Sequence, residues 1–273
     1  MLSFIRQLNE GVAATDLQKL VFLHTMAGES GYYEFIPYKF GAYSFHLKED
    51  ADILELAGFV FSDNARIKAT GVFSEESTFR IEPERGDALI RKSYRKYPYY
   101  AINSEITGRL FHGEELERFI GGRRAYVQSE QILFTIGYEG KSIEAFINAL
   151  IQNDVRVLCD VRRNPLSRKF GFSKGKLEHI AQTVGIEYVH IPDLGIESDK
   201  RNSLETPEDY ERLFDEYEKT LPSKRMFLDK IHSLLEKNTR VALMCFELDP
   251  KMCHRHVIRD SIVGTHRVGS ADL

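Results

Sequence analysis

Four mostly apolar runs in the second half of the chain constrain its fold more than any other feature. They cover residues 132–136, 155–161, 186–191 and 240–246. Stretches with helical apolar spacing separate and follow them, over residues 142–150, 174–183, 207–220, 224–236 and 250–263. The runs do not alternate between apolar and polar residues, which is typical of strands buried on both faces of a parallel sheet. Residues 132–273 are therefore expected to form an α/β, Rossmann-like parallel-sheet domain.

The first half of the chain has a different pattern. Helical spacing covers residues 2–9, 16–26 and 43–57, and short strands are expected at 59–61, 65–69 and 78–81. Three helices followed by a β-ribbon is the order of a winged helix. Two further helices, at about 84–96 and 114–120, complete this half. Residues 1–131 are therefore expected to form a mostly helical, winged-helix-like domain with a helical connector.

Composition limits the classes of function. The net charge of −4 provides no general attraction for nucleic acid, so any such contact needs a local basic patch. Three cysteines, an odd number, favour reduced thiols and a cytoplasmic location. No apolar run approaches the roughly 20 residues that span a bilayer, and the first ten residues lack a signal-peptide pattern, so no membrane contact is expected.

Polar side chains gather where the predicted strands end. In a parallel sheet these ends share one edge, where ligands usually bind. The sequence therefore predicts one crevice, formed by Tyr138 and Glu139 after the first strand, Asp160, Arg162, Arg163 and Asn164 at the second, His190 at the third, and Cys245, Glu247, Cys253, His254 and Arg255 at the fourth.

Two carboxylates at this crevice are candidate catalytic groups. Glu247 and Asp160 each lie at the end of a buried strand near arginines, and either carboxylate is a general acid/base or one half of a structural ion pair. The arginines suit a phosphate or a carboxylate group. The set would suit the cleavage or transfer of N-glycosidic or phosphate-ester bonds in a nucleotide.

The turn after the fourth strand offers a third candidate. Asp249 and Pro250 suit a helix start, which would place Cys253 in the first turn, where the helix dipole favours a thiolate nucleophile. The alternative is a buried, inert cysteine. The cysteines and His254 lack the paired spacing of zinc motifs, so no metal is predicted, and Gly-x-Gly-x-x-Gly is absent, so no cofactor is predicted.

A basic and aromatic segment in the first half is the candidate nucleic-acid contact. Its cations could bind phosphates while its tyrosines stack on bases. The alternative is an amphipathic helix with a solvated basic face. The cations are Arg91, Lys92, Arg95 and Lys96.

Two resemblances extend this interpretation. The segments 17–23, 38–44 and 54–58 resemble bacterial winged-helix-like modules of regulatory and antitoxin-type domains, with Gly41-Ala-Tyr-Ser44 in place of their usual Gly-Pro-Tyr-Ser. In the second half, the segments 135–140, 160–167 and 192–195, together with Cys245-x-Glu247 and Cys253-His-Arg255, resemble the family catalogued as "domain of unknown function 488". The first implies DNA binding or a protein–protein role. The second implies a Rossmann-like domain with an enzyme-like pocket and no settled reaction.

Three functions follow as hypotheses. The first is a bacterial enzyme that acts on a nucleotide or nucleic acid, targeted by the winged-helix-like domain. The second is a non-catalytic DNA-binding regulator that senses a small phosphorylated ligand. The third is an antitoxin-like interaction module. A homodimer is among the expected assemblies.

Overall fold

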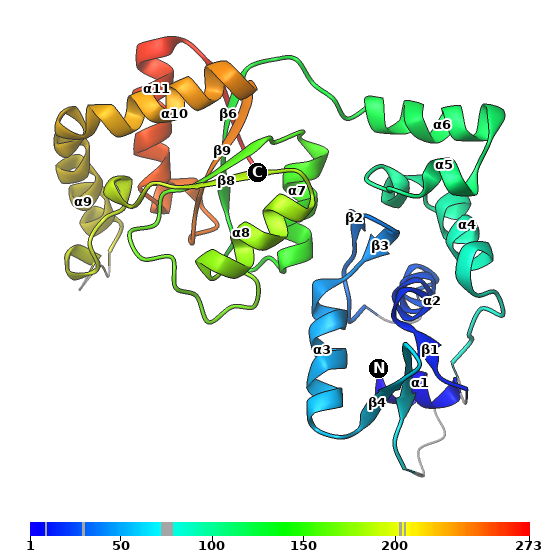
Figure 1. Cartoon of the computed structure of the whole chain (residues 1–273). Coiled ribbons are helices and arrows are strands. Elements are labelled where there is room, and N and C mark those ends of the chain that lie inside the picture. The colour runs from blue at the N-terminus through cyan, green and yellow to red at the C-terminus, as the bar shows by residue number, and fades with distance from the viewer. Residues whose placement is uncertain (9, 29–30, 72–78, 202–203, 205) are drawn as a thin grey trace. The chain divides into compact units, whose positions relative to one another are not determined.

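The computed structural model describes residues 1–8, 10–28, 31–71, 79–201, 204 and 206–273. The chain divides into two units, Met1–Ala125 and Tyr126–Leu273, whereas the sequence placed the boundary at residue 131 (Figure 1). The two units are called the N-terminal unit and the C-terminal unit below. Within the described ranges, no helix has the length and apolarity needed to cross a membrane.

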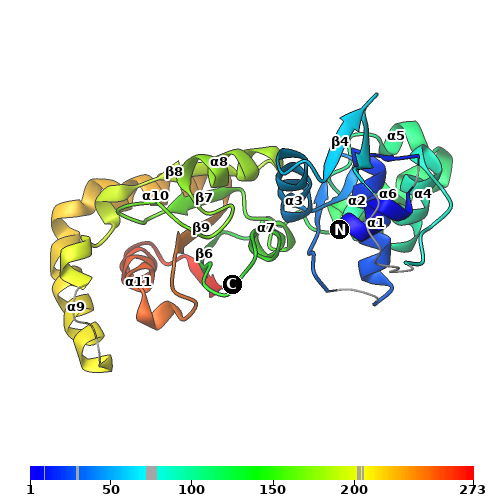
Figure 2. The same cartoon turned by 90° about the horizontal axis from the view of Figure 1, so that it is seen from below.

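The C-terminal unit contains the predicted parallel sheet. Its strand order is β10-β6-β9-β7-β8, and every neighbouring pair is parallel. The bounds are β6 Ile132–Gly137, β7 Val157–Asp160, β8 Glu187–His190, β9 Arg240–Cys245 and β10 Gly269–Asp272. The α/β prediction is thus confirmed. Strand β10, which pairs with β6 at one edge (Figure 2), was not predicted because its sequence, Gly-Ser-Ala-Asp, has no apolar run.

Helices cover both faces of this sheet. In Figure 1, α7 and α8 lie on one side and α10 and α11 on the other. The bounds are α7 Ile143–Gln152, α8 Lys174–Thr183, α9 Pro207–Thr220, α10 Arg225–Asn238 and α11 Arg255–His266. Alternate strand residues point to opposite faces, and one face packs on α9, α10 and α11 through Leu133, Val157, Cys159, Val241, Leu243, Ile231, Leu235, Ile258 and Ile262.

In this strand order, neighbouring strands are followed by connections that lead to opposite faces of the sheet. The chain leaves β6 and β7 toward α7 and α8, but it leaves β9, which lies between them, toward α11. Loops that part in this way open a crevice at the carboxyl ends of the strands. These ends and their loops are called the carboxyl rim below.

Side-chain caps begin α7 and the turn after β9, and the predicted start of the last helix is corrected. The Ser142 hydroxyl accepts a hydrogen bond from the Ala145 N–H at 2.9 Å and begins α7. Asp249 likewise accepts from the Lys251 N–H at 2.8 Å, but it begins only a 3-10 turn, Pro250–Met252. Helix α11 starts at Arg255, so the predicted helix start at residue 250 is wrong, and Cys253 and His254 precede the helix.

The N-terminal unit contains the three predicted helices and the ribbon β4–β5, but β1 lies between the first two helices and the hairpin β2–β3 precedes the third. Antiparallel strands β1, β5 and β4 form one sheet in that order, and β2 pairs with β3. Its elements are α1 Leu2–Gln7, β1 Val12–Ala13, α2 Ala14–Met26, β2 Ile36–Tyr38, β3 Gly41–Tyr43, α3 Phe45–Leu56, β4 Val60–Asp63, β5 Arg66–Ala69, α4 Gly86–Lys96, α5 Thr107–Leu110 and α6 Gly113–Arg124. Of the strand predicted at 78–81, residue 78 lies outside the described residues and residues 79–81 form no strand.

The segment Gly41-Ala-Tyr-Ser44 has a packing role. Gly41 has φ +91°, and a side chain there would collide with the ring of Tyr94. Ser44 begins α3 by accepting from the Leu47 N–H at 3.2 Å, and its own N–H donates to Gln18 Oε1 at 2.8 Å. This segment therefore joins α2, α3 and α4 into one core.

Candidate site at the carboxyl rim

The structure brings six of the twelve predicted rim residues to one cavity of about 230 Å³. Segments at the ends of four neighbouring strands, β6, β9, β7 and β8, form it. We call it the rim cavity; it is lined by Tyr138, Arg162, Arg163, Asn164, Leu166, Ile196, Cys245, Phe246 and Glu247.

Asp160 and Arg162 form a buried ion pair below this cavity. Nε of Arg162 donates to Oδ1 of Asp160 at 2.8 Å, and Nη2 donates to Oδ2 at 2.5 Å. The Arg162 N–H also donates to Oδ1, and the Tyr188 hydroxyl donates to Oδ2 at 2.6 Å. Burial, then the Asp160 charge, raises the pKa of Tyr188, so its proton stays in place. Both carboxylate oxygens thus accept two hydrogen bonds each.

The remaining donors of Arg162 hold the rim loops. Nη1 donates to the Tyr138 hydroxyl at 3.1 Å and to the Phe172 carbonyl at 2.9 Å. The Tyr138 ring stacks on Phe172, with ring centroids 4.3 Å apart. Asp160 and Arg162 thus have the contacts of a structural ion pair, the alternative to an acid/base role, because their polar atoms bind groups of the protein.

Arg255 has a similar internal role. Only 1% of its surface is exposed, and its guanidinium donates to the backbone carbonyls of Glu247 at 2.6 Å and Leu248 at 2.9 Å. It also donates to Thr135 Oγ1 at 3.2 Å. From the other side, Glu139 accepts from the Leu248 N–H at 2.9 Å. Arg255 and Glu139 therefore shape the turn after β9 and do not point into the cavity as substrate ligands.

Two glycines allow the loops to meet. A Cβ at Gly137 would overlap the carbonyl oxygen of Glu247, and a Cβ at Gly195 would overlap the backbone of Arg163. Because these contacts are backbone to backbone, no side-chain rotation relieves them. The glycines thus bring Glu247 and Arg163 to the rim from different strands.

Glu247 is the predicted acid/base residue that remains at the cavity surface. Its side chain is partly buried and lines the rim cavity. It also lines a neighbouring space of about 100 Å³ beside Cys253 and His254. Glu247 thus stays a candidate acid/base group at the cavity, whereas the carboxylate of Asp160 accepts hydrogen bonds from Arg162 and Tyr188.

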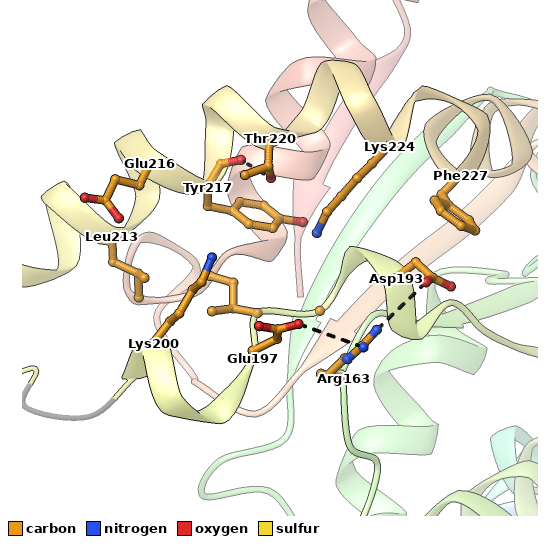
Figure 3. A pocket seen from close by; sticks show the side chains of 12 residues that line it. Arg163, Asp193, Glu197, Lys200, Leu213, Glu216, Tyr217, Thr220, Lys224 and Phe227 are labelled. Atoms are coloured by element: carbon orange, nitrogen blue, oxygen red, sulfur yellow. Dashed lines mark hydrogen bonds and ion pairs between the residues drawn. The ribbon is translucent and has the colours of Figure 1, made fainter.

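A larger cavity of about 350 Å³ adjoins the rim cavity and shares Arg163 and Ile196 with it. We call it the cationic cavity, because Arg163, Lys200 and Lys224 line it (Figure 3). Asp193, Glu197 and Glu216 add acids, and Leu213, Tyr217 and Phe227 add apolar surface. The sequence did not indicate Lys200, Lys224 or Tyr217, since they lie on helical turns far along the chain from any strand end.

The cations of this cavity affect one another. Burial lowers the pKa of Lys224, and the charges of Arg163 and Lys200 lower that pKa further. The Lys224 ammonium lies 5.1 Å from the ring centre of Tyr217. Arg163 reaches its acids only at 3.8 Å from Asp193 and 4.0 Å from Glu197, with about half of each side chain exposed. These long pairs leave the guanidinium available to a stronger anion.

The other predicted binding residues lie around this edge. Asn164 is exposed in the rim cavity. His190 is partly buried, and its Nε2 donates to the Arg162 carbonyl at 3.0 Å. His190 is thus another support of the loop after β7.

Cys253 does not have the environment that the sequence predicted. It is 1% exposed, and burial, with Cys245 next to it, raises its pKa well above the ordinary value. The prediction of a thiolate activated by a helix start is therefore wrong, because α11 begins at Arg255, two residues after Cys253. The sequence also predicted no metal, yet Cys245, Cys253 and His254 place their ligand atoms within 4.8 Å of one another.

The candidate nucleic-acid residues are engaged within the N-terminal unit. Lys92 binds Glu82 at 2.5 Å and Glu84 at 2.9 Å, and Arg95 binds Glu115 at 2.7 Å. Arg91 donates to the Leu110 carbonyl at 3.0 Å. The Lys96 ammonium lies over the Tyr97 ring at 5.4 Å. These contacts are those of an amphipathic helix, the alternative that the sequence left open.

Residues 142–262 match the family model described as "Domain of unknown function DUF488". The match runs from the start of α7 into α11, so it includes the loops of the carboxyl rim after β7, β8 and β9. No curated protein and no solved structure matches the chain. The winged-helix resemblance of the N-terminal unit stays a prediction.

Proposed function

We propose that this chain, whose residues 142–262 match the DUF488 family model, binds a phosphorylated nucleotide at the carboxyl rim and acts on it as a hydrolase or transferase. The observation that carries the proposal is the cationic cavity, where Arg163, Lys200 and Lys224 surround about 350 Å³. This volume lies within the roughly 300–1,000 Å³ typical of small-molecule sites.

Three cations and three acids line the cavity, and the proposal depends on an anion reaching Arg163 more closely than Asp193 and Glu197 do. Three cations in one partly buried space repel one another, and the lowered pKa of Lys224 reflects both its burial and that repulsion. A bound phosphate relieves the repulsion and gives Arg163 a two-pronged partner in place of its long contacts with Asp193 and Glu197.

The rest of the lining suits a nucleoside. Leu213, Tyr217 and Phe227 offer apolar and aromatic surface on the same cavity, and such surface stabilises a base or a sugar face. Arg163 also lines the rim cavity together with Glu247. A phosphate held at Arg163 therefore brings the ligand to the cavity that contains the acid/base candidate.

Calorimetric titration with ribonucleoside diphosphates and with inorganic pyrophosphate tests the binding step. We expect saturable binding that weakens at least tenfold in Lys224→Ala. Arg225→Ala is the matched control, because Arg225 is a nearby cation whose side chain is 74% exposed and lies outside the cationic cavity. Equal loss in both variants, or no binding of either probe by the wild type, would contradict the proposal.

A non-catalytic sensor is the second candidate, and the geometry of Asp160, Arg162 and Arg255 favours it. Their polar groups are occupied by internal partners, which leaves Glu247 as the principal acid/base group. Release of product from labelled nucleotides distinguishes the two: an enzyme turns the ligand over, whereas a sensor binds it unchanged.

For the N-terminal unit we propose a protein contact in preference to DNA. Of the cations of α4, Lys92 pairs with Glu82 and Glu84, and Arg95 pairs with Glu115. Helix α3 carries acidic residues, and apolar side chains are exposed on it and on the adjoining ribbon: Ile53, Leu56, Phe59 and Phe61. Such a surface repels phosphates and suits an apolar partner.

Fluorescence anisotropy with duplex DNA at several salt concentrations checks this choice. We expect weak binding that the change of Arg91, Lys92, Arg95 and Lys96 to Ala leaves nearly unaltered. Tight binding that falls steeply with salt and disappears in that variant would establish the DNA-binding alternative.

A further inference from the structure

Cys245, Cys253 and His254 form a buried cluster of soft ligands that the proposed function does not use. Cys245 ends β9, and the 3-10 turn Pro250–Met252 brings the chain back so that Cys253 and His254 face it. Their ligand atoms lie within 4.8 Å of one another. All three side chains are at most 1% exposed.

The imidazole of His254 is oriented for coordination. Nε2 lies 3.1 Å from the carbonyl oxygen of Val161, and because a carbonyl only accepts, Nε2 carries the proton. In the tautomer that this hydrogen bond favours, Nδ1 carries the lone pair, and it lies 3.9 Å from Sγ of Cys245 and 3.9 Å from Sγ of Cys253. A carbonyl that fixes the tautomer is the usual second partner of a metal-binding histidine. The Tyr217 ring packs edge-on against the imidazole, at 5.6 Å between centroids.

We propose that Cys245, Cys253 and His254 bind one Zn²⁺ ion, with a fourth coordination position open to the space beside Glu247. Zinc takes sulfur at about 2.3 Å and nitrogen at about 2.0–2.1 Å, so tetrahedral coordination places sulfur and nitrogen ~3.6 Å apart. The observed 3.9 Å separations need to contract by only a few tenths of an ångström.

Charge selects a divalent ion. Two thiolates and a neutral imidazole carry a charge of −2, so Zn²⁺ leaves the buried site neutral, whereas a monovalent ion leaves an uncompensated charge there. Coordination of both sulfurs as thiolates exchanges two thiol protons, released to solvent, for one zinc ion.

The fourth position has room and polar neighbours. A space of about 100 Å³ lies against Cys253 and His254 and is lined also by Glu247, Met252, Tyr210 and Phe214. Zinc with three protein ligands and one open position binds a water or a ligand atom. The carboxylate of Glu247 borders both this space and the rim cavity.

The test uses the full chain purified in the presence of a phosphine reductant, with zinc measured by mass spectrometry and far-UV circular dichroism as a check of folding. We expect one zinc per chain after reconstitution, and release of two protons per ion in weak buffer. Replacement by Co²⁺ should give thiolate-to-cobalt charge-transfer absorption and the strong visible bands of tetrahedral cobalt. This measurement on the wild type needs no variant.

Cys245→Ala and Cys253→Ala should each lose stoichiometric metal. Cys159→Ala is the matched control, because Cys159 is equally buried in β7 but lies outside the cluster, and it should keep one zinc per chain. The proposal is overturned if the reduced wild type takes up neither zinc nor cobalt, or if folded Cys245→Ala and Cys253→Ala retain the ion.

Discussion

The guanidinium of Arg162 binds both oxygens of the Asp160 carboxylate, through Nε at 2.8 Å and Nη2 at 2.5 Å. The pair is buried, with 6% of the Arg162 side chain and 0% of the Asp160 side chain exposed. Through Tyr138, Phe172 and Tyr188 it joins strands β6, β7 and β8 at the carboxyl rim. The same two residues that suggest catalysis in the sequence thus hold the loops that surround the cavity.

Asp160→Asn should destabilise the chain by about 3–5 kcal/mol, because it leaves a buried guanidinium without its charge partner. The loss is measured by guanidinium denaturation. Asp229→Asn removes one half of an exposed pair with Arg225, whose side chains are 54% and 74% exposed, and should cost no more than about 0.5 kcal/mol. Similar losses in the two variants would disagree with a structural role for Asp160.

Gly137→Ala should destabilise by at least about 1–3 kcal/mol, the usual cost of overpacking, because the new methyl group meets the Glu247 carbonyl. Gly175→Ala, in α8, meets no atom within 4 Å and should be neutral or stabilising by roughly 0.5–1 kcal/mol. Thermal unfolding of both variants compares them. If Gly137→Ala unfolds at the wild-type temperature, the backbones at residues 137 and 247 can move apart to admit the methyl group.

Lys19 should make the stability of the chain depend on pH. It is 1% exposed and donates to the Ala42 carbonyl at 2.8 Å. Burial lowers its pKa to about 7, and Asp16 opposes the shift. Its ordinary pKa is 10.5, so the unfolded chain binds more protons between about pH 7 and 10.5, and stability rises with pH across this window.

The stability that depends on neutral Lys19 is fully present above its unfolded-state pKa. It is lost as the pH falls toward the folded-state pKa. Relative to Lys19→Met, the wild type should therefore gain about 2 kcal/mol between pH 7 and pH 9. Lys48→Met, at a half-exposed lysine of α3, should show no such difference. Denaturation curves at pH 7 and pH 9 give the free energies of unfolding. If the difference between wild type and Lys19→Met is the same at both pH values, the pKa of Lys19 is not lowered.

Glu247→Gln should abolish turnover of the nucleotide while the chain still binds it. The side chain lines the rim cavity next to Arg163, and the amide cannot exchange a proton in the reaction. Product release and calorimetric affinity, measured on the same preparation, separate the two effects. Retained turnover in this variant would exclude Glu247 as the acid or base, whereas loss of binding alone would assign it to ligand recognition.

Much of the fold follows from local signals. The apolar runs at 132–136, 155–161, 186–191 and 240–246 became β6, β7, β8 and β9, because buried parallel strands need apolar residues on both faces. Ser142 caps α7, and Asp249 caps the turn after β9, although the helix predicted to start there begins only at Arg255. Strand β10 was missed, since an edge strand of small and polar residues carries no apolar pattern.

The site depended on contacts between distant segments. Only the order β6-β9-β7 places Glu247 among Tyr138 and Arg163, and only the packing of the helical turns brings Lys200 and Lys224 to Arg163. Burial then decided the chemistry: it paired Asp160 with Arg162 and raised the pKa of Cys253. The sequence by itself determined which segments form strands and helices, because those depend on neighbours along the chain. The tertiary structure decided which side chains meet, because desolvation and charge depend on neighbours in space.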